Sequence, residues 1–422
     1  IFKQHYHLSC QWNRIMGLLR RVWLKLTPTK AVQCEREEAM FFEYMYRVIY
    51  LTGLSFSDDD LLYYIYSTIV KLSLILLCLS ELWQFLSTEW TIDTIIDSVN
   101  ITIIQLSAVF KYKKRVTKRL ASSMNSPNFD LSTDERKKLL EVWRKRNEGH
   151  LKLLLALGTC TIIAWYIYPL VDDLEYNLMV SIRLPYSYQS PFLYSITYIL
   201  VIIVFSYISY FVMVNDLIIQ AHLMHLLCQF SILRDCFKNL LKDCKEDFKQ
   251  NQLYSNKKFR QRFTKRLGAL IQQHTFILKN TSDLENILSG PMLAQMAAST
   301  TLICSIGYQL VATSVNVNIT KWLMSLLYLA YNMFVLYILC RWCEEIKIQS
   351  EAIGKAVYFS GWERGITKIP GVRSSLLLIL ARCNKPLVLS AGGMYDLSLE
   401  AYATMVKTSY SALTMLLRFR QN

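Results

Sequence analysis

Seven stretches of the chain are apolar over about 20 residues, which is the length of helix that crosses a bilayer. Polar segments separate them, and the last stretch is broken into two halves. The pattern therefore predicts an all-α polytopic membrane protein with seven transmembrane helices. The predicted spans are Leu61–Leu86, Thr91–Phe110, Leu151–Leu170, Pro191–Ile219, Leu284–Val311, Trp322–Cys340 and, for the second half of the seventh, Leu397–Leu417.

Prolines and glycines predict where two of these spans are interrupted. Gly290-Pro291 falls inside the fifth span, where proline removes a backbone donor, so we expect a break there. Lys385-Pro386 follows the short apolar stretch Ser374–Leu380 and separates it from the last helix. The seventh span is accordingly expected to be a broken helix, whose second half crosses the membrane.

A long stretch between the fourth and fifth spans, Gln220–Asn280, carries apolar residues at helical spacing among charges. This periodicity predicts an amphipathic helix that continues from the membrane, with a break near Asn251–Asn256. The expected division of the chain is then an N-terminal segment 1–60, spans one to four 61–219, a helical extension 220–283, spans five and six 284–343, a polar segment 344–385, and the seventh helix with a short tail 386–422.

Lysine and arginine fill every second connection between spans, and this alternation predicts the orientation. The connection Lys111–Lys152 is dense with them, whereas Ser87–Thr91 has none and Ala312–Lys321 has one. Because basic loops stay in the cytoplasm, the N-terminus is expected inside the cell. With seven spans the C-terminus is then outside, and 1–60, 220–283 and 344–385 are cytoplasmic.

The composition fits this class and argues against others. The chain has 422 residues, 53% hydrophobic, with a net charge of +15. Basic cytoplasmic loops beside anionic lipid account for that charge, so nucleic-acid binding is not expected. Eleven cysteines are present, and no predicted outer loop holds a pair of them, so no disulfide framework is expected.

Signals for an enzyme or a metal site are poor. His222 and His225 lie three apart on one helix face, and Cys340 and Cys343 have CxxC spacing, but neither pair has the further ligands that a metal site needs. An ordinary helix surface and packing cysteines explain them better. We expect no catalytic activity, no cofactor and no metal.

Aromatic side chains gather in the outer halves of the third, fourth and sixth spans. A mostly apolar cavity with a few polar groups suits a small hydrophobic ligand, and these residues are its candidate wall. An interfacial belt of aromatic rings and ordinary helix packing is the alternative. The candidates are Trp165, Tyr166, Tyr168, Tyr194, Tyr198, Tyr328, Tyr331 and Asn332.

Charged residues within spans and one glycosylation motif are further candidates. Glu400 and Lys407 lie two turns apart near one face of the last helix, where they either pair with a neighbouring helix or border a water-filled path. Glu81, Asp93 and Asp97 lie near outer span ends. Asn318-Ile319-Thr320 falls in an outer loop, which makes Asn318 the expected glycosylation site.

The C-terminal sequence Lys407-Thr408-Ser409-Tyr410-Ser411, followed by an apolar run ending Leu416-Leu417-Arg418, resembles the signature of insect odorant receptors. The pattern Met394–Tyr402 before it adds support. The resemblance covers the whole chain by architecture but only Gly392–Phe419 by motif. It implies a subunit of a tetrameric ligand-gated non-selective cation channel, with an odorant pocket among spans two, three, four and six. It also implies that the cytoplasmic segments pack into an anchor and that the last helix lines the pore.

Within that resemblance, Met415 corresponds to an apolar gate residue, and Lys407, Thr414 and Arg418 belong to the same pore helix. Four Arg418 side chains would oppose cation entry, which departs from the family's co-receptor. The expectation is therefore an odour-tuning subunit that requires the insect odorant co-receptor, in the plasma membrane of olfactory sensory neurons. A gustatory-type channel, a metabotropic seven-helix receptor and a transporter or membrane enzyme are the alternatives.

Overall fold

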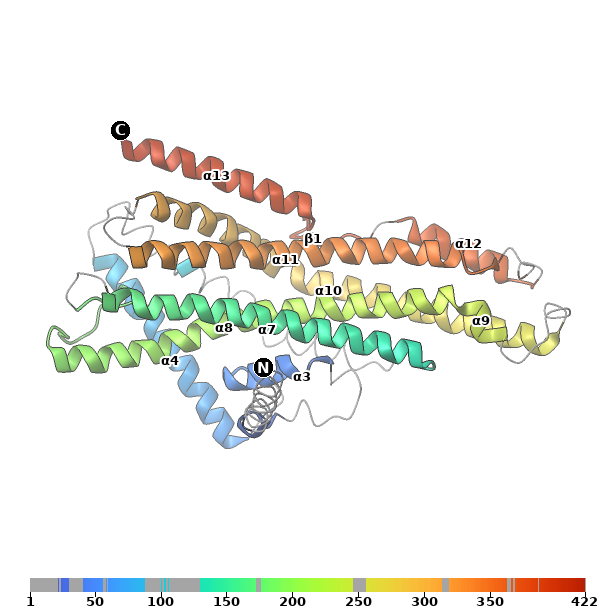
Figure 1. Cartoon of the computed structure of the whole chain (residues 1–422), viewed down its shortest axis with the longest axis horizontal. Helices are drawn as coiled ribbons and strands as arrows, with labels where there is room; N and C mark the ends of the chain where they lie inside the picture. Colours follow the sequence, from blue (N-terminus) through green and yellow to red (C-terminus); the bar gives the residue numbers. More distant parts are fainter. Residues whose placement is uncertain are drawn as a thin grey trace, which may run out of the picture.

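Long helices lying side by side make up most of the computed structural model (Figure 1). Five of them are α4 (Leu61–Ser87), α7 (Asp134–Val171), α8 (Pro191–Lys238), α10 (Lys257–Ala312) and α11 (Ile319–Tyr358). The structure describes residues 41–55, 60–87, 130–171, 176–245, 256–312, 319–362, 369–385 and 387–421, with isolated positions at 22–29, 58, 100–105 and 366.

Each of these five helices is long and apolar enough to cross a membrane. Together with the helical content, they confirm an all-α membrane protein. The predicted second span, Thr91–Phe110, lies almost entirely outside the described residues. The last helix, α13 (Leu399–Gln421), is more polar and carries Glu400 and Lys407.

Helix α8 forms the centre of the bundle and contacts α3 (Glu43–Leu51), α4, α7, α10 and α11. All its residues from Met213 to Leu233 are buried. The helix continues past Gln220 as the periodicity predicted, but the predicted amphipathic character is wrong for residues 220–233, because this part of α8 has no exposed face. The charges that suggested such a face lie farther along, in Arg234–Lys238, α9 (Leu240–Lys245) and the start of α10.

The two histidines on α8 are buried, and this corrects the prediction of an ordinary helix surface. His222 and His225 are each 5% exposed. The ring of Phe42 lies 5.4 Å from that of His222 and 5.0 Å from that of His225. The segment leading into α3 covers this side of α8, and the local sequence of α8 gives no signal for it.

Helix α10 continues through Pro291 without a break, so the predicted interruption at Gly290-Pro291 is wrong. Proline removes one backbone donor but leaves the rest of the helix ladder intact. A distant part of the chain also contacts α10 near Pro291, because the amide of Gly392 donates to the carbonyl of Ser289 at 3.0 Å.

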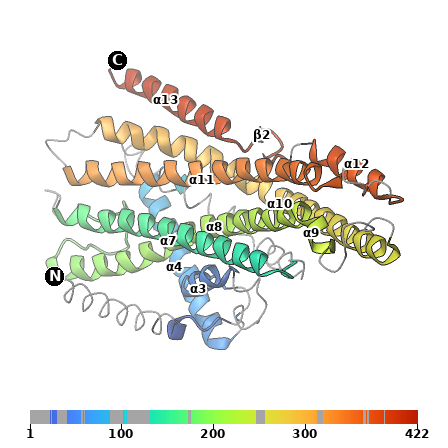
Figure 2. The same ribbon diagram turned by 45° about the vertical axis from the view of Figure 1, so that its right-hand side comes forward.

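The seventh segment is divided as the sequence predicted. Helix α12 (Val372–Cys383) ends just before Lys385-Pro386, and α13 begins at Leu399. Between them lies a small antiparallel hairpin of β1 (Ser390–Ala391) and β2 (Tyr395–Asp396), which the hydrophobic pattern did not reveal. Helix α13 lies on the outside of the bundle beside α10 (Figure 2).

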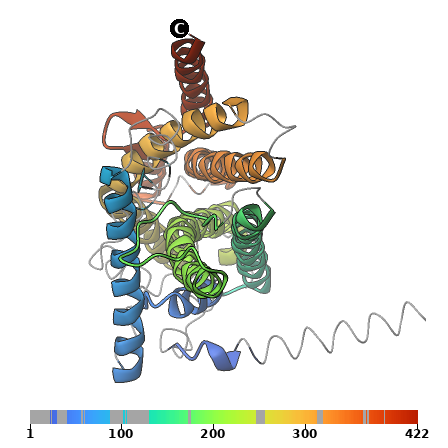
Figure 3. The ribbon, with the colours of Figure 1, turned by 90° about the vertical axis from the view of Figure 1, so that its left-hand side faces the viewer.

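Helix α4 runs obliquely at the edge of the bundle, as the end-on view shows (Figure 3). Its outward residues are large and apolar; Leu62, for example, is 82% exposed. In a membrane-spanning helix, such a face contacts lipid, so its exposure costs nothing there.

Candidate functional site

A cavity of about 180 Å³ lies within the bundle, between α7, α8, α10 and α11. Its wall is mostly apolar with a few polar groups, which is the usual character of a small-molecule site. Residues of the loop after α7 and of the 100–105 region complete it. The lining includes Asn100, Gln105, Gly158, Trp165, Tyr168, Met179, Phe205, Ile208, Met213, Gln309, Lys321, Tyr328 and Tyr331.

One wall of the cavity is aromatic. The ring centroid of Trp165 on α7 lies 5.4 Å from Phe205 on α8 and 6.0 Å from Tyr328 on α11, with Tyr328 edge-on. Three helices thus contribute rings that hold one another in place, and such pairs prefer these tilted geometries. The wall is therefore built before any ligand enters.

The inner end of the cavity depends on a glycine. A Cβ added at Gly158 would lie 2.5 Å from the sulfur of Met213, 2.6 Å from its terminal methyl group and 3.3 Å from a ring carbon of Tyr331. Only a residue without a side chain lets Met213 and Tyr331 approach α7 this closely.

The loop after α7 folds inward rather than remaining an exposed outer loop. Leu178, Met179, Val180 and Ile182 are all buried, in one cluster with Tyr198 and Phe205 of α8. The predicted third and fourth spans, Leu151–Leu170 and Pro191–Ile219, leave the residues between them only as a connection. The apolar run Leu178-Met179-Val180 was the signal that could have revealed its packing.

Polar groups near the cavity are mostly paired. The Gln105 amide donates to the Glu81 carboxylate at 2.6 Å, and the Cys78 thiol donates to the Gln105 carbonyl oxygen at 3.1 Å. Asn100 accepts a hydrogen bond from Ser305 on α10. The carboxylate of Glu81 thus has the neighbouring partner that an intramembrane acid needs.

The structure brings four of the eight predicted pocket residues into the cavity wall: Trp165, Tyr168, Tyr328 and Tyr331. Their contact with a ligand stays a prediction.

The other four are engaged in helix and loop packing. The Tyr198 hydroxyl donates to the Tyr166 carbonyl at 2.6 Å, and the Tyr194 hydroxyl donates to the Asn177 carbonyl at the same distance. The Tyr166 hydroxyl shares a hydrogen bond with Ser206, and the Asn332 amide donates to the Tyr328 carbonyl.

The predicted pore residues lie on α13. Lys407, Met415 and Arg418 are exposed, and their spacing places them along one face of the helix. Thr414 is half-buried, and its hydroxyl donates to the Ser411 carbonyl at 2.8 Å. The roles of these four residues stay predictions. Asn318, Asp93 and Asp97 lie outside the described residues.

Helix α10 connects the cavity with α13. Gln309 of α10 lines the cavity, and two residues away, on another face of the same helix, a Cβ at Gly307 would lie 3.0 Å from Leu413 of α13. Farther along, the fully buried Ser409 of α13 donates to the Thr300 carbonyl at 3.1 Å. The cavity and α13 therefore both contact the same helix, α10.

A ligand-sized cavity inside a bundle of membrane-length helices is the architecture of a membrane receptor. Residues 91–410 match the family model of the 7tm odorant receptors, and the chain belongs to that family. Its relatives are receptors, which agrees with the expected absence of catalysis.

Curated relatives include odorant receptors 2a and 13a of Drosophila melanogaster. The chain is 27% identical to receptor 2a over 135 residues, covering 32% of this chain and 33% of that receptor. It is 23% identical to receptor 13a over 283 residues, covering 63% of this chain and 65% of that receptor. The matched regions thus span less than two thirds of either relative.

The fold also matches the solved structure of the insect olfactory receptor OR5 from Machilis hrabei in complex with eugenol. The TM-score is 0.75 at 16% identity, and the match covers 91% of this chain and all of that one. This similarity confirms the fold that the hydrophobic pattern predicted.

Proposed function

We propose that this chain is the odour-tuning subunit of a heteromeric, ligand-gated, non-selective cation channel. Its partner is the insect odorant co-receptor, and its place is the plasma membrane of olfactory sensory neurons. The observation that supports this most is the cavity, whose aromatic wall would hold a small volatile molecule. The eugenol that the Machilis hrabei receptor binds is a ligand of this kind.

Opening follows from the shared helix α10. A ligand that binds better when the last helices are splayed shifts the equilibrium toward the open state by its difference in affinity. Because α10 borders the cavity at Gln309 and contacts α13 at Gly307 and Thr300, a change in the cavity alters the position of α13 directly.

The exposed face of α13 would line the pore, with Met415 as the apolar gate. Arg418 and Lys407 add positive charge along this face, and rings of positive charge oppose cation entry. This chain is therefore a poor pore former alone, and co-receptor subunits would supply the remaining pore surface.

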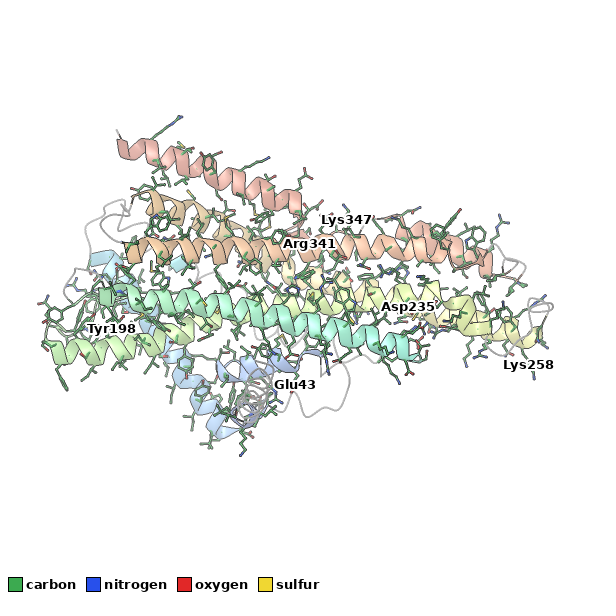
Figure 4. All side chains as sticks on the ribbon, viewed as in Figure 1. Glu43, Tyr198, Asp235, Lys258, Arg341 and Lys347 are labelled. Carbon is green, nitrogen blue, oxygen red and sulfur yellow. The ribbon has the colours of Figure 1, made fainter. Side chains whose placement is uncertain are left out.

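The cytoplasmic anchor is proposed at the end of the bundle remote from the cavity. The N-terminal ends of α7 and α10 meet α9 and the C-terminal end of α8 there, and Arg136 pairs with Asp130, Asp235 and Asp243. Asp235 and Tyr198 lie toward opposite ends of α8 (Figure 4). The proposed orientation places Arg136 in the cytoplasm and Tyr198 in the outer half of the membrane.

Whole-cell current during exposure to volatile odorants tests the proposal, in cells that express this chain with and without the co-receptor. Current only from the pair is the expected result. Current from this chain alone would contradict the role given to Arg418. Silence of the pair, with both subunits at the cell surface, would refute the channel function.

Alanine at Trp165 or Tyr331 tests the cavity as the site. Each change removes a ring from the wall, so the concentration of odorant for half-maximal current should change by about tenfold or more. Leu200→Ala is the matched control, because Leu200 is 56% exposed on the outer face of α8. Unchanged dose–response curves in both cavity variants would refute this assignment.

A further inference from the structure

The charged residue of the cavity wall lies at one end of the cavity. On α11, Lys321 lies in the first turn, while Tyr328 and Tyr331 lie about 10 Å and about 15 Å farther along the axis. Gln309 and Tyr168 also lie within the last turn of α10 and α7. The cavity therefore has a charged and polar mouth and a mostly apolar inner end, where Thr161 and Ser209 also belong to the wall.

Lys321 is the charged residue of this wall, and it forms no ion pair with any residue that the structure describes. Two other charged groups in the described part of the chain have polar partners: one carboxylate oxygen of Glu81 accepts from Gln105, and Arg136 pairs with three carboxylates. An ammonium group beside an apolar cavity is stabilised by an oxygen acceptor, and hydrogen bonds to a charged donor are the stronger kind.

The inner end is closed by a single adaptable side chain. Met213 lies directly over the bare backbone of Gly158, beside Tyr331. A thioether chain fills irregular space and changes rotamer readily, so its position determines the depth of the cavity.

We propose that the cavity takes an elongated amphipathic molecule, with a carbonyl or carboxylate oxygen at Lys321 and an apolar tail that ends on Met213. The volume of about 180 Å³ limits the ligand to a small one, since a dry cavity of roughly 150 Å³ accommodates benzene. This inference rests on the proposed function for its electrical readout, and it specifies the ligand class of that site.

The head group is tested with straight-chain carboxylic acids, aldehydes and alkanes of increasing length, applied to cells that express this chain with the co-receptor. Lys321→Met keeps the length of the side chain and removes its charge, and Lys321→Arg keeps the charge. We expect Lys321→Met to raise the half-maximal concentration of the oxygenated compounds about tenfold or more, and Lys321→Arg to change it much less.

If Lys321→Met raises the half-maximal concentration more for acids than for aldehydes, the ligand is a carboxylate. If it raises both equally, the ligand is a neutral carbonyl compound. Both results support the inference. Alkanes as potent as oxygenated compounds, or no effect of Lys321→Met on either class, would overturn it.

The inner end is tested with Met213→Ala and Gly158→Ala. Removing the thioether deepens the cavity and should shift the preferred chain toward longer compounds. A methyl group at Gly158 displaces Met213 toward the cavity and should shift the preference toward shorter ones. Surface biotinylation shows whether each variant is assembled, and Met213→Ala keeps the test decisive if Gly158→Ala fails to fold. An unchanged preferred length in an assembled Met213→Ala variant would overturn this part.

Thermal shift of the purified wild-type chain with the same compounds separates the two proposals. A chain that is stabilised by the oxygenated series but carries no current with the co-receptor would refute the channel and leave the ligand class standing. Robust currents that are indifferent to both Lys321→Met and Met213→Ala would leave the channel and refute the ligand class.

Discussion

Replacing Arg136 with methionine should destabilise the bundle more than any surface change. The Arg136 side chain is 1% exposed, and its guanidinium lies 3.1 Å from Asp235, 3.2 Å from Asp130 and 2.5 Å from Asp243. Methionine fills a similar length without charge. The change leaves three carboxylates near one remaining cation, Arg266, which contacts Asp130 and lies 3.7 Å from Asp243.

The loss in free energy of unfolding caused by Arg136→Met depends on how deeply each partner is buried. Removing one member of a buried ion pair costs about 3–5 kcal/mol, because the other member is left uncompensated. The three carboxylate side chains keep 16–27% of their exposure, so water moderates the loss, and we expect the lower end of that range. With an unfolding entropy of ~2 cal/mol/K per residue, 3 kcal/mol lowers the melting temperature of a 422-residue cooperative unit by about 3.5 °C.

The assay is a thermal melt of the detergent-solubilised protein, followed by size-exclusion chromatography. Arg144→Met is the control, since Arg144 lies on the same helix but pairs with Glu141 at 34% exposure; it should cost at most about 0.5 kcal/mol. Adding Asp243→Asn to Arg136→Met should recover part of the lost melting temperature. Equal melting temperatures of Arg136→Met and Arg144→Met, within error, would refute the reasoning.

Three further predictions concern the connection to α13 and the chemistry of α9. Gly392→Ala should cost roughly 2–4 kcal/mol, seen as reduced surface expression, because Gly392 has φ 63° and a Cβ there would lie 2.6 Å from Leu293. Ser409→Ala removes the hydrogen bond to Thr300 and should weaken the α10–α13 contact by about 1 kcal/mol. Because the proposed movement passes through this contact, the half-maximal concentration of odorant should rise. Burial raises the pKa of the Cys244 thiol from 9.0 to about 11, so maleimide should label Cys244 only after unfolding. The neutral thiol's contribution to the free energy of unfolding is present below pH 9 and should be lost as pH rises toward 11.

The hydrophobic pattern predicted the fold well because membrane-length apolar helices are a local property of the sequence. Span boundaries near Leu61, Pro191 and Leu397 agree with the helix ends of the structure. The two errors, at Pro291 and in the exposed face of α8, both concern what surrounds a helix. Gly392 contacts α10 from about one hundred residues away in sequence, and the hydrophobic periodicity of α10 cannot predict such a contact.

The sequence predicted which types of residue would line the cavity, but not which individual residues would do so. Aromatic rings in the outer halves of spans predicted a wall, and Trp165, Tyr168, Tyr328 and Tyr331 do line the cavity. Tyr198 has the same type and depth but points its hydroxyl to a backbone carbonyl of α7. Which face of a helix meets the cavity depends on its rotation in the bundle, which the sequence of one helix does not determine.

One end of the bundle is held together by ion pairs, and the other contains the cavity. The distance between them keeps these two regions separate. Arg136 and Trp165 are 29 residues apart on α7, which is about 43 Å along the axis. At the Arg136 end, the Arg136 guanidinium of α7 pairs with Asp130, with Asp235 of α8 and with Asp243 of α9, which holds these helices together. At the Trp165 end, a cavity and the Lys321 ammonium remain available to a small molecule. In the proposed mechanism the binding region changes shape, and such regions belong to the less stable part of a protein. The ion pairs at the distal end would then let that change be transmitted along α10 to α13 instead of being lost by separation of the helices.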